Sequence, residues 1–395
     1  MIRFDRKDQS VTLRPEAGRW DLRDAGQMEV HLTNNGAGSL VPRIQLHSNS
    51  GATTIRETAP VPAGASRTLV IEFAPPVPWN AADYPPGEER RDPLPSGTKW
   101  SSKAVSGISF HSEASGNQSA FTVSGIKAVP AITPGKVTVV EKPPFEGEWV
   151  MTLDETFDGA GPDETVWNVH TANHWDKKTA FSRDNVMLKN GAAHLRFEHR
   201  ESRHNDEADG ELKSYTSGFL DTFGKWTQRY GYFEARMKLP RSPGLWPAFW
   251  TMPDRGPQAA PRWKREQTTN GGMEFDIMEY LSSWGPYRYN VAFHWDGYGK
   301  NHKSSGTSGI YMKPDEEGFI TAGLLWLPGK AAYFCNGELV GKWESDRICS
   351  VPSILMFTHV SGGWDNEPLD NAQLPDDFVI DHVRCWQRSD LVEKP

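Results

Sequence analysis

The ten residues Gly271-Gly-Met-Glu-Phe-Asp-Ile-Met-Glu-Tyr280 place three carboxylic acids in an otherwise apolar run. Burial of charged carboxylates in an apolar run costs free energy, so three acids at these positions indicate a function. Side chains alternate between the two faces of a β-strand. Glu274 and Asp276 therefore share one face, while Phe275 and Ile277 point to the other. The run predicts a strand with an acidic face and a core face.

Glu279 lies at an odd separation from Glu274 and would point to the core in a regular strand. One extra residue near Ile277 and Met278, a β-bulge, returns it to the acidic face, and bulges re-aim side chains beside active sites. About four effective strand steps then separate the two glutamate Cα atoms by ~13 Å. Because each side chain can lean inward, the two carboxyl groups can reach the spacing of ~5–5.5 Å that marks retaining glycosidases. We predict this bulge.

Asp276 lies between the two glutamates, where it can hydrogen-bond an attacking carboxylate. By like-charge repulsion it can also help to keep a second carboxyl group protonated. In isolation, however, the pattern E-x-D-x-x-E is equally typical of a solvated acidic strand face or of a calcium cluster. The surrounding sequence decides between these interpretations.

The composition of the 395-residue chain restricts the class of protein. It has 16 Trp, 18 Phe and 10 Tyr, and flat aromatic rings suit sugar faces and β-sandwich cores equally. A net charge of −8 argues against a nucleic-acid partner, which requires a basic surface. No apolar run is long enough to span a bilayer. The three cysteines Cys335, Cys349 and Cys385 have no C-x-x-C spacing, which excludes a disulfide scaffold and argues against a zinc site.

Short alternating runs closed by turn residues extend along the chain and predict an all-β protein. Runs such as Met28–Thr33 predict a smaller N-terminal β-sandwich over residues 1–128. Residues 129–148 are rich in proline, which holds the backbone extended and cannot donate to a ladder, so we predict a linker there. Alternation resumes over residues 149–395, for example at Tyr230–Met237, and predicts a second, larger β-sandwich.

Motifs on both sides of the acidic strand resemble glycoside hydrolase family 16, the group of laminarinases, agarases and carrageenases. The run Tyr230–Pro240 leads into Gly244-Leu-Trp-Pro-Ala-Phe-Trp250, and the acidic strand follows after a loop. Further family-like pieces, in the family's order, are Trp149 with Asp154-Glu-Thr-Phe-Asp158, Tyr215-Thr-Ser-Gly218 and Asp381-His-Val-Arg384. The resemblance covers about residues 149 to 388. It implies a curved antiparallel β-sandwich, a jelly roll, with a substrate cleft on its concave face.

The resemblance also implies a role for each acid: Glu274 as the nucleophile, Asp276 as the assisting aspartate and Glu279 as the acid/base of a retaining double displacement. Such a reaction needs no cofactor. Trp250 is expected to line the cleft. His294 is expected near the acids on a neighbouring strand, with a purely structural histidine as the alternative. Three further tryptophans, Trp175, Trp263 and Trp295, complete the expected substrate contacts.

Some family members hold a structural calcium ion on the convex side. The matching residues here are Glu155 and Asp381, for which two ordinary surface acids are the alternative. We assign Trp246 to the core. We expect Glu234 and Arg236 to form a structural ion pair within the sheet.

The resemblance implies an endo-acting retaining hydrolase that cleaves internal β-glycosidic bonds of a polysaccharide, with a laminarin-like β-1,3-glucan as the expected substrate. The long polar loop 255–270 and the His-, Lys- and aromatic-rich run His294–Lys303 depart from β-1,3-glucanases. They leave a red-algal galactan (agarose, porphyran, carrageenan or furcellaran) as an alternative. A non-catalytic glucan-binding protein is a second alternative, although both glutamates are present. A transglycosylase is a third, which the bulge spacing disfavours because the plant enzymes of that kind lack the extra residue.

A polysaccharide substrate points to a secreted, periplasmic or cell-surface protein, and we expect a monomer. Residues 1–10 contain no apolar signal-peptide region, so the sequence itself fits a cytosolic chain equally well, or one whose signal peptide has been replaced. The N-terminal domain is expected to be an accessory domain. It either binds carbohydrate, through Trp20 or Trp79, or braces the catalytic domain.

Overall fold

The computed structural model divides the chain into two compact units. One unit comprises Met1–Pro75, Asp92–Thr133 and Ser283–Arg288, and the other comprises Pro76–Arg91, Pro134–Ser282 and Tyr289–Pro395. The structure describes residues 1–4, 9–22, 25, 27–48, 51–53, 55–72, 79–80, 102–112, 119–129, 143, 145–172, 178–282, 288–311, 314–362 and 368–392. Among these residues, no helix combines the length and the apolar character needed to cross a membrane.

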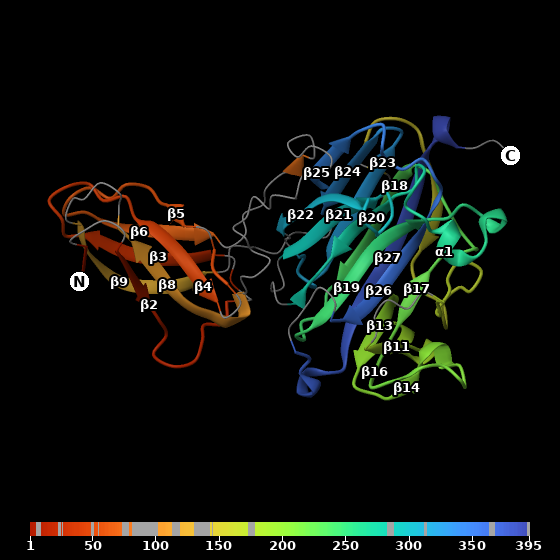
Figure 1. Ribbon diagram of the computed structural model, residues 1–395, viewed down its shortest axis with the longest axis horizontal. Helices are drawn as coiled ribbons and strands as arrows, with labels where there is room; N and C mark the ends of the chain where they lie inside the picture. Colours follow the sequence, from red (N-terminus) through yellow and green to blue (C-terminus); the bar gives the residue numbers. More distant parts are fainter. Residues whose placement is uncertain are drawn as a thin grey trace. The chain divides into compact units, whose positions relative to one another are not determined.

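The smaller unit consists of two four-stranded antiparallel sheets that share one core (Figure 1). The first sheet has the order β1 (Ile2–Phe4), β9 (Ser119–Val129), β3 (Gln27–Asn34) and β6 (Ser66–Glu72). The second has the order β2 (Ser10–Leu13), β8 (Val105–His111), β4 (Arg43–Ser48) and β5 (Arg56–Glu57), and η2 (Ser102–Ala104) precedes β8. Alternation along β3 buries Met28, Val30 and Leu32 between the sheets. Trp20 packs against this core, and the side chain of Trp79 lies outside the described residues.

The larger unit is built on an eleven-stranded sheet and a six-stranded sheet. The eleven-stranded sheet has the order β11 (Thr179–Phe181), β16 (Tyr215–Ser217), β13 (Ala192–Glu198), β27 (Asp376–Arg388), β18 (Gly231–Lys238), β23 (Ile320–Leu327), β24 (Lys330–Cys335), β25 (Glu338–Glu344) and β7 (Trp79–Asn80). Two more strands complete it: β10 (Trp149–Glu155) pairs with β27, and β12 (Val186–Lys189) pairs with β13.

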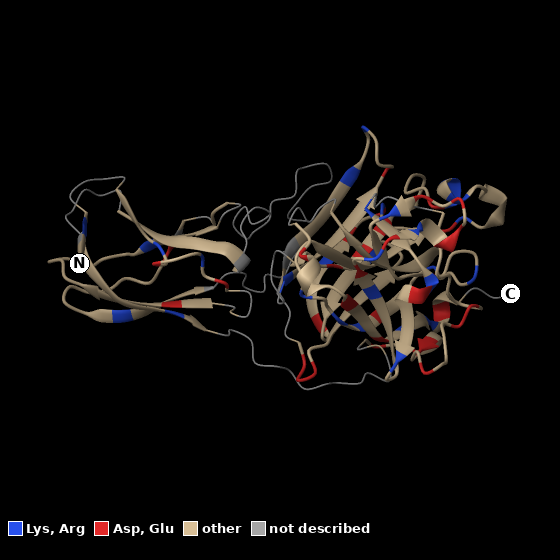
Figure 2. Cartoon of the chain, turned by 90° about the horizontal axis from the view of Figure 1, so that it is seen from below, with Lys and Arg blue, Asp and Glu red and all other residues tan. Residues whose placement is uncertain are grey.

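The six-stranded sheet has the order β17 (Phe219–Asp221), β26 (Ser353–Ser361), β19 (Leu245–Pro253), β20 (Glu274–Glu279), β21 (Arg288–Trp295) and β22 (Lys303–Tyr311). The remaining elements are short: the ribbon β14 (Ser202–Arg203) with β15 (Leu212–Lys213), η3 (Arg183–Asn185), η4 (His204–Asp206), η5 (Pro257–Ala259), α1 (Arg262–Arg265), η7 (Asn371–Gln373) and η8 (Ser389–Leu391). Acidic and basic residues are interspersed over this unit (Figure 2).

One apolar core joins these two sheets. Phe275 of β20 illustrates the contact, because its ring centroid lies 5.3 Å from Trp326 of β23 and 5.6 Å from Phe293 of β21. The prediction of an all-β, largely antiparallel architecture is confirmed.

The predicted linker lies between β9, which ends at Val129, and β10, which begins at Trp149. Most of these residues lie outside the described part of the chain. Phe145 is described, and its ring packs 4.9 Å from Phe334 and 5.3 Å from Tyr232 on the eleven-stranded sheet. The domain boundaries at residues 128 and 149 stay a prediction.

Candidate active site

The acidic strand β20 contains the predicted bulge. Asp276 lies opposite Ala292 of β21, and Glu279 lies opposite Asn290. Three residue steps on β20 therefore correspond to two on β21, and the pairing with β19 shifts at the same place. One extra residue in β20 lies between the two acids, where the parity of the sequence requires it.

The bulge separates core side chains from acidic ones. Phe275, Ile277 and Met278 are at most 1% exposed and belong to the core between the sheets. Because two successive apolar residues are buried at the bulge, Glu279 returns to the face that carries Glu274 and Asp276. Asp276 and Glu279 are 3% and 7% exposed, and Glu274 is partly exposed. All three predicted acids thus lie on one face of the six-stranded sheet.

Glu279 is held by two nitrogen donors. The indole Nε1 of Trp246 on β19 donates to its Oε1 at 3.2 Å, and the amide Nδ2 of Asn290 on β21 donates to its Oε2 at 2.7 Å. The assignment of Trp246 to the core was wrong, because its side chain is partly exposed and contacts an acid on the opposite face. The sequence spacing already indicates this position of Trp246, since Trp246 and Trp250 lie four residues apart on one strand and so share a face.

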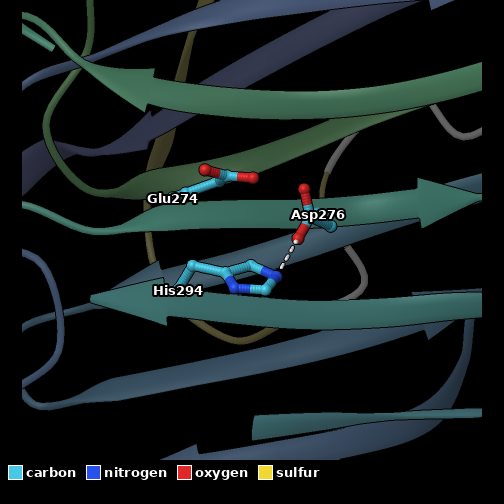
Figure 3. Close-up of side chains that lie close together, drawn as sticks. All are labelled: Glu274, Asp276 and His294. Carbon is cyan, nitrogen blue, oxygen red and sulfur yellow. Dashed lines mark ion pairs between the residues drawn. The ribbon is translucent and has the colours of Figure 1, made fainter. Parts of the chain in front are cut away.

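At the other end of the strand, Glu274, Asp276 and His294 converge (Figure 3). His294 Nε2 lies 3.2 Å from Asp276 Oδ2, and one polar atom from each of the three side chains falls within 4.8 Å of the others. Two carboxylates and an imidazole are also a donor set for a metal ion. Burial raises the pKa of Glu274 well above its usual value, and repulsion by the neighbouring carboxylates of Asp276 and Glu279 adds to the effect.

Trp250 lies beside Asp276 on the neighbouring strand, and its role in lining a cleft stays a prediction. It pairs with Asp276 on one side and with Met356 of β26 on the other, and its Nε1 donates to Thr358 Oγ1 at 3.2 Å. Together with Trp246 it packs on a second apolar cluster that contains Met252 and Met356. This cluster gives the acidic face an apolar, aromatic floor next to the carboxylates.

Trp263 is 60% exposed on the short helix α1 of the loop between β19 and β20. The helix is anchored by Arg262, whose guanidinium lies 2.5 Å from Asp221 and 4.1 Å from the ring centroid of Phe223. Asp221 pairs with Met356 in the six-stranded sheet, and Phe223 belongs to the apolar floor. The helix that carries the exposed indole is therefore anchored to the six-stranded sheet through Arg262, and a role of Trp263 as a substrate contact stays a prediction.

Trp295 does not reach this face. It is 2% exposed in the core, with its ring centroid 4.9 Å from that of Trp343. Because it directly follows His294 on one strand, strand alternation turns its side chain to the opposite side. We therefore withdraw it from the predicted substrate contacts. Trp175 lies outside the described residues.

Two residues near the acids escaped prediction. The chain turns sharply after β21, where Asp296 and Gly297 adopt φ values of 61° and 82°. This turn brings Tyr298 and His302 next to His294, with ring centroids 6.5 Å and 5.1 Å from the imidazole. The run His294–Lys303 was recognised as rich in rings and cations, but only the turn geometry determines which of them meet the site.

Glu155 and Asp381 do not fit the predicted calcium site. Glu155 accepts hydrogen bonds from the backbone N–H of Phe157 at 2.7 Å and from Trp167 Nε1 at 2.9 Å. Asp381 Oδ2 lies 3.1 Å from Arg236 Nη1. A calcium ion needs several free oxygen ligands, and a guanidinium beside one of them would repel the ion.

Arg236 also corrects a second prediction. Its guanidinium binds Asp315 at 2.6 Å and Glu317 at 2.9 Å, so its partners are not the predicted Glu234. Glu234 is 2% exposed, its side chain forms a hydrogen bond with that of Tyr232, and His382 Nε2 lies 4.0 Å away. Burial raises the pKa of Glu234.

Comparison with known sequences settles the family. The profile of Glycosyl hydrolases family 16 matches residues 171–384, more than half of the chain, and this span contains the three acids. The chain belongs to this family. It is accordingly a glycosidase, and the retaining mechanism is general to family 16.

Curated relatives are distant and differ in length. A beta-glucanase of Rhodothermus marinus is 26% identical over 259 residues, which are 60% of this chain and 85% of the relative. Glucan endo-1,3-beta-glucosidase A1 of Niallia circulans is 23% identical and matches 62% of this chain but 39% of its own length. A keratan-sulfate endo-1,4-beta-galactosidase of Sphingobacterium multivorum is 24% identical over 45% of this chain and 42% of its own length.

Solved family 16 structures share the fold. The catalytic domain of an endo-1,3-beta-glucanase (laminarinase) from Thermotoga petrophila aligns with a TM-score of 0.51 at 22% identity, covering 62% of this chain and 100% of the domain. LamAcat from Zobellia galactanivorans aligns with a TM-score of 0.50 at 22% identity, covering 60% of this chain and 97% of that structure. These likenesses confirm the predicted jelly-roll fold of the larger unit.

Proposed function

We propose that this family 16 enzyme is an endo-acting β-glucan hydrolase that cleaves internal β-1,3 bonds by double displacement. The observation that carries the proposal is the bulge in β20, because it alone brings Glu274, Asp276 and Glu279 to one face. The curated relatives named as glucanases support the choice of a glucan.

In the first step the Glu274 carboxylate attacks the anomeric carbon and forms a covalent ester with the sugar. Glu279 transfers its proton to the departing glycosidic oxygen as that bond breaks. In the second step Glu279 removes a proton from water, the water oxygen attacks the anomeric carbon, and Glu274 leaves as a carboxylate. The configuration at the anomeric carbon is therefore retained.

The site supplies the proton that these two reaction steps require. Three carboxylates so close together resist simultaneous ionisation, so the group keeps a proton at a pH where isolated carboxyl groups have lost theirs. The pKa of Glu274 is raised by burial and by the neighbouring carboxylates of Asp276 and Glu279, which expresses this coupling. The proton belongs to the coupled group, and sugar binding between Glu274 and Glu279 transfers it to the acid that faces the leaving oxygen.

The floor of the site favours a neutral sugar. Trp246 and Trp250 offer partly exposed rings on an apolar cluster, which suits the C–H faces of glucose units. A sulfated galactan would require free cations. Lys303, from the run that suggested such a substrate, lies 3.3 Å from Asp296 and is engaged there. A red-algal galactan, unsulfated or sulfated, is therefore the second candidate substrate after a neutral glucan.

A substrate panel tests the proposal directly. Reducing-end release is measured on laminarin, mixed-linkage glucan, agarose, porphyran, κ-carrageenan and furcellaran, with chain-length analysis of early products. We expect rapid shortening of laminarin to oligosaccharides, and Glu274→Ser should abolish it. Activity on a galactan alone would replace the glucan assignment. Activity on none, with intact binding of laminarin, would identify a glucan-binding protein.

Two further points belong to this proposal. Polymer substrates lie outside cells, so we propose that the enzyme acts there, as a monomer. We also propose water as the acceptor of the glycosyl group, because β20 retains the bulge residue. Product analysis with added oligosaccharide acceptors would reveal transglycosylation as products longer than the substrate.

A further inference from the structure

Three rings form a cluster beside the acids. His294 is on β21, and Tyr298 and His302 come from the loop between β21 and β22. The imidazoles of His294 and His302 are stacked, with centroids 5.1 Å apart and an interplanar angle of 11°. The Tyr298 ring lies 5.5 Å from His302, and its hydroxyl lies 3.7 Å from Sδ of Met252 on β19. We call His294, Tyr298 and His302 the ring cluster.

The ring cluster is connected to Asp276 through His294. One nitrogen of His294, Nε2, lies 3.2 Å from Asp276 Oδ2, and the other, Nδ1, lies 2.9 Å from His302 Nε2. Asp276 is 3% exposed, and its Oδ2 accepts no hydrogen bond from the described residues, so the ion-pair contact with His294 Nε2 is the interaction that it has there. Both nitrogens of His294 are therefore engaged, one by a carboxylate and one by a second imidazole.

We propose that His302 is a positioning residue that keeps a hydrogen on Nε2 of His294, directed at Asp276. A neutral imidazole carries its hydrogen on either nitrogen, and the partner of one nitrogen decides which. With the hydrogen on Nδ1, His294 would present a bare lone pair to a carboxylate. His302 prevents this by donating its own Nε2–H to Nδ1. When His294 is protonated, the same atom of His302 can accept from Nδ1–H instead.

This inference rests on the proposed role of Asp276 in the reaction. Asp276 lies between the two glutamates, so a hydrogen on Nε2 of His294 holds its Oδ2 and leaves its other oxygen for the nucleophile. The groups that face His294 are Glu274 and Asp276 from β20 and Tyr298 and His302 from the loop. Burial, with a contribution from the nearby charge of His294, lowers the pKa of His302, which keeps His302 neutral and able to serve as either donor or acceptor.

The loop holds His302 in place independently of the acids. Asp296 of the same loop binds Lys303 at 3.3 Å and Arg347 at 3.0 Å. Arg347 in turn donates to the backbone oxygens of Thr268 and Gly272, just before β20. The loop that carries His302 and the segment that enters the acidic strand are therefore fixed by a common arginine.

Two variants separate positioning from other roles. His302→Phe keeps an aromatic ring and loses the hydrogen bond, while His302→Gln keeps a side chain that can donate or accept and loses the ring. Loss of one hydrogen bond predicts a fall in kcat of about 3- to 10-fold for His302→Phe, with KM nearly unchanged. His302→Gln should remain close to the parent. Loss of kcat with raised KM in both variants would identify a substrate contact and overturn the proposal.

The pH profile adds a readout that a structural role would not change. Protonated His294 carries a hydrogen on Nε2 whatever its neighbour, whereas neutral His294 depends on His302. The deficit of His302→Phe should therefore be larger at high pH, where imidazoles are neutral, than at low pH, where they are protonated, and its pH optimum should move down. A constant deficit at all pH values would overturn the proposal.

Failure of this inference can be told apart from failure of the proposed function. Asp276→Asn alone tests the role of Asp276, and the double variant with His302→Phe should be no slower than Asp276→Asn, because His302 acts through that carboxylate. A further drop in the double variant would contradict the inference alone. Nitrogen NMR of the full chain labelled at histidine requires no substrate. It should show His294 with hydrogen on Nε2 in the parent and a mixture of tautomers in His302→Phe.

Discussion

Two groups of neighbouring acids occupy the two sheets of the larger unit, and they are neutralised in different ways. Around Arg236 on the eleven-stranded sheet, one guanidinium binds Asp315, Glu317 and Asp381. Burial there opposes ionisation, but hydrogen bonds from His382 and Arg236 lower the pKa of Asp381 below its usual value. On β20, burial and carboxylate neighbours raise the pKa of Glu274. In the first arrangement the carboxylates are paired with a cation, whereas in the second the carboxylates repel one another.

The contrast shows where the protein retains an arrangement of charges that lowers its stability. A guanidinium next to the β20 acids would relieve their repulsion, but it would also remove the proton that a general acid must deliver. Stability and chemistry therefore impose opposite requirements on similar side chains. The predictions that follow change one group at a time and are ordered by the size of the expected effect.

The largest effect is expected for Glu274→Gln. Removal of the nucleophile should lower kcat on the substrate that the parent cleaves by about 10⁴-fold or more. Because the amide also removes a conflicting carboxylate, Tm should not fall and should rise if repulsion dominates. Steady-state kinetics and calorimetry on the same preparation check both statements. Normal turnover by this variant would exclude Glu274 as the nucleophile.

Glu279→Gln should reduce hydrolysis by about 10²- to 10⁴-fold, the range for loss of a general acid or base. The first step should recover on an aryl glycoside with a good leaving group, since that group needs no proton. Measuring both substrates with parent and variant separates the acid from the nucleophile. An equal loss on both would show that Glu279 has another role.

Arg236→Met should leave turnover per folded molecule unchanged and destabilise the fold by about 3 kcal/mol, because it strands carboxylates around a buried site. Denaturant unfolding followed by tryptophan fluorescence measures the loss. Asp315→Asn serves as the matched control, because it removes one buried acid and keeps the cation. A fall in kcat without loss of stability would show that this group of acids communicates with the cleft.

The smallest effect concerns the pH dependence of stability, which should have opposite signs in the two groups. Because the pKa of Asp381 is lowered in the folded state, its ionisation stabilises the fold. This contribution to the free energy of unfolding is present above the unfolded pKa of ~4 and is lost as pH falls. Because the pKa of Glu274 is raised in the folded state, its protonated form is favoured there. This contribution to the free energy of unfolding is present below pH ~4 and is lost as pH rises through the folded pKa. Asp381 is one-third exposed, so its share is small.

Thermal unfolding from pH 3 to 8 tests this difference. The Tm advantage of Glu274→Gln over the parent should increase with pH. The deficit of Asp381→Asn should shrink as pH falls below about 4. Parallel curves for parent and both variants would contradict the assigned directions.

Parity made much of the fold and the acidic strand predictable from the sequence. Alternation identified the strands, and the odd spacing of Glu274 and Glu279 required the bulge that β20 contains. The same rule was applied incompletely elsewhere. It places Trp295 opposite to His294 and Trp246 on the face of Trp250, yet Trp295 was predicted in the cleft and Trp246 in the core.

Contacts between distant segments could not be read from the sequence in this way. His302 reaches His294 because of a turn at Asp296 and Gly297, and nothing in local spacing fixes that turn. Arg236 and Asp315 are 79 residues apart, so their ion pair follows from the pairing of strands and not from a pattern. The calcium prediction likewise considered Asp381 without its cationic neighbour Arg236, which only the pairing of strands brings beside it.

The bulge makes the length of β20 part of the catalytic apparatus. Deletion of either Ile277 or Met278 would leave every acid in the chain and reduce the separation of the two glutamates to an even number of residues, so a regular strand without a bulge would still carry all three acids on one face. Because a bulge bends a strand and increases its twist, the deletion would instead change the distance and the angle between the nucleophile and the acid/base. Loss of a single codon is thus a route from the bulged to the regular form of this strand, and the two forms differ in geometry while they share all three acids.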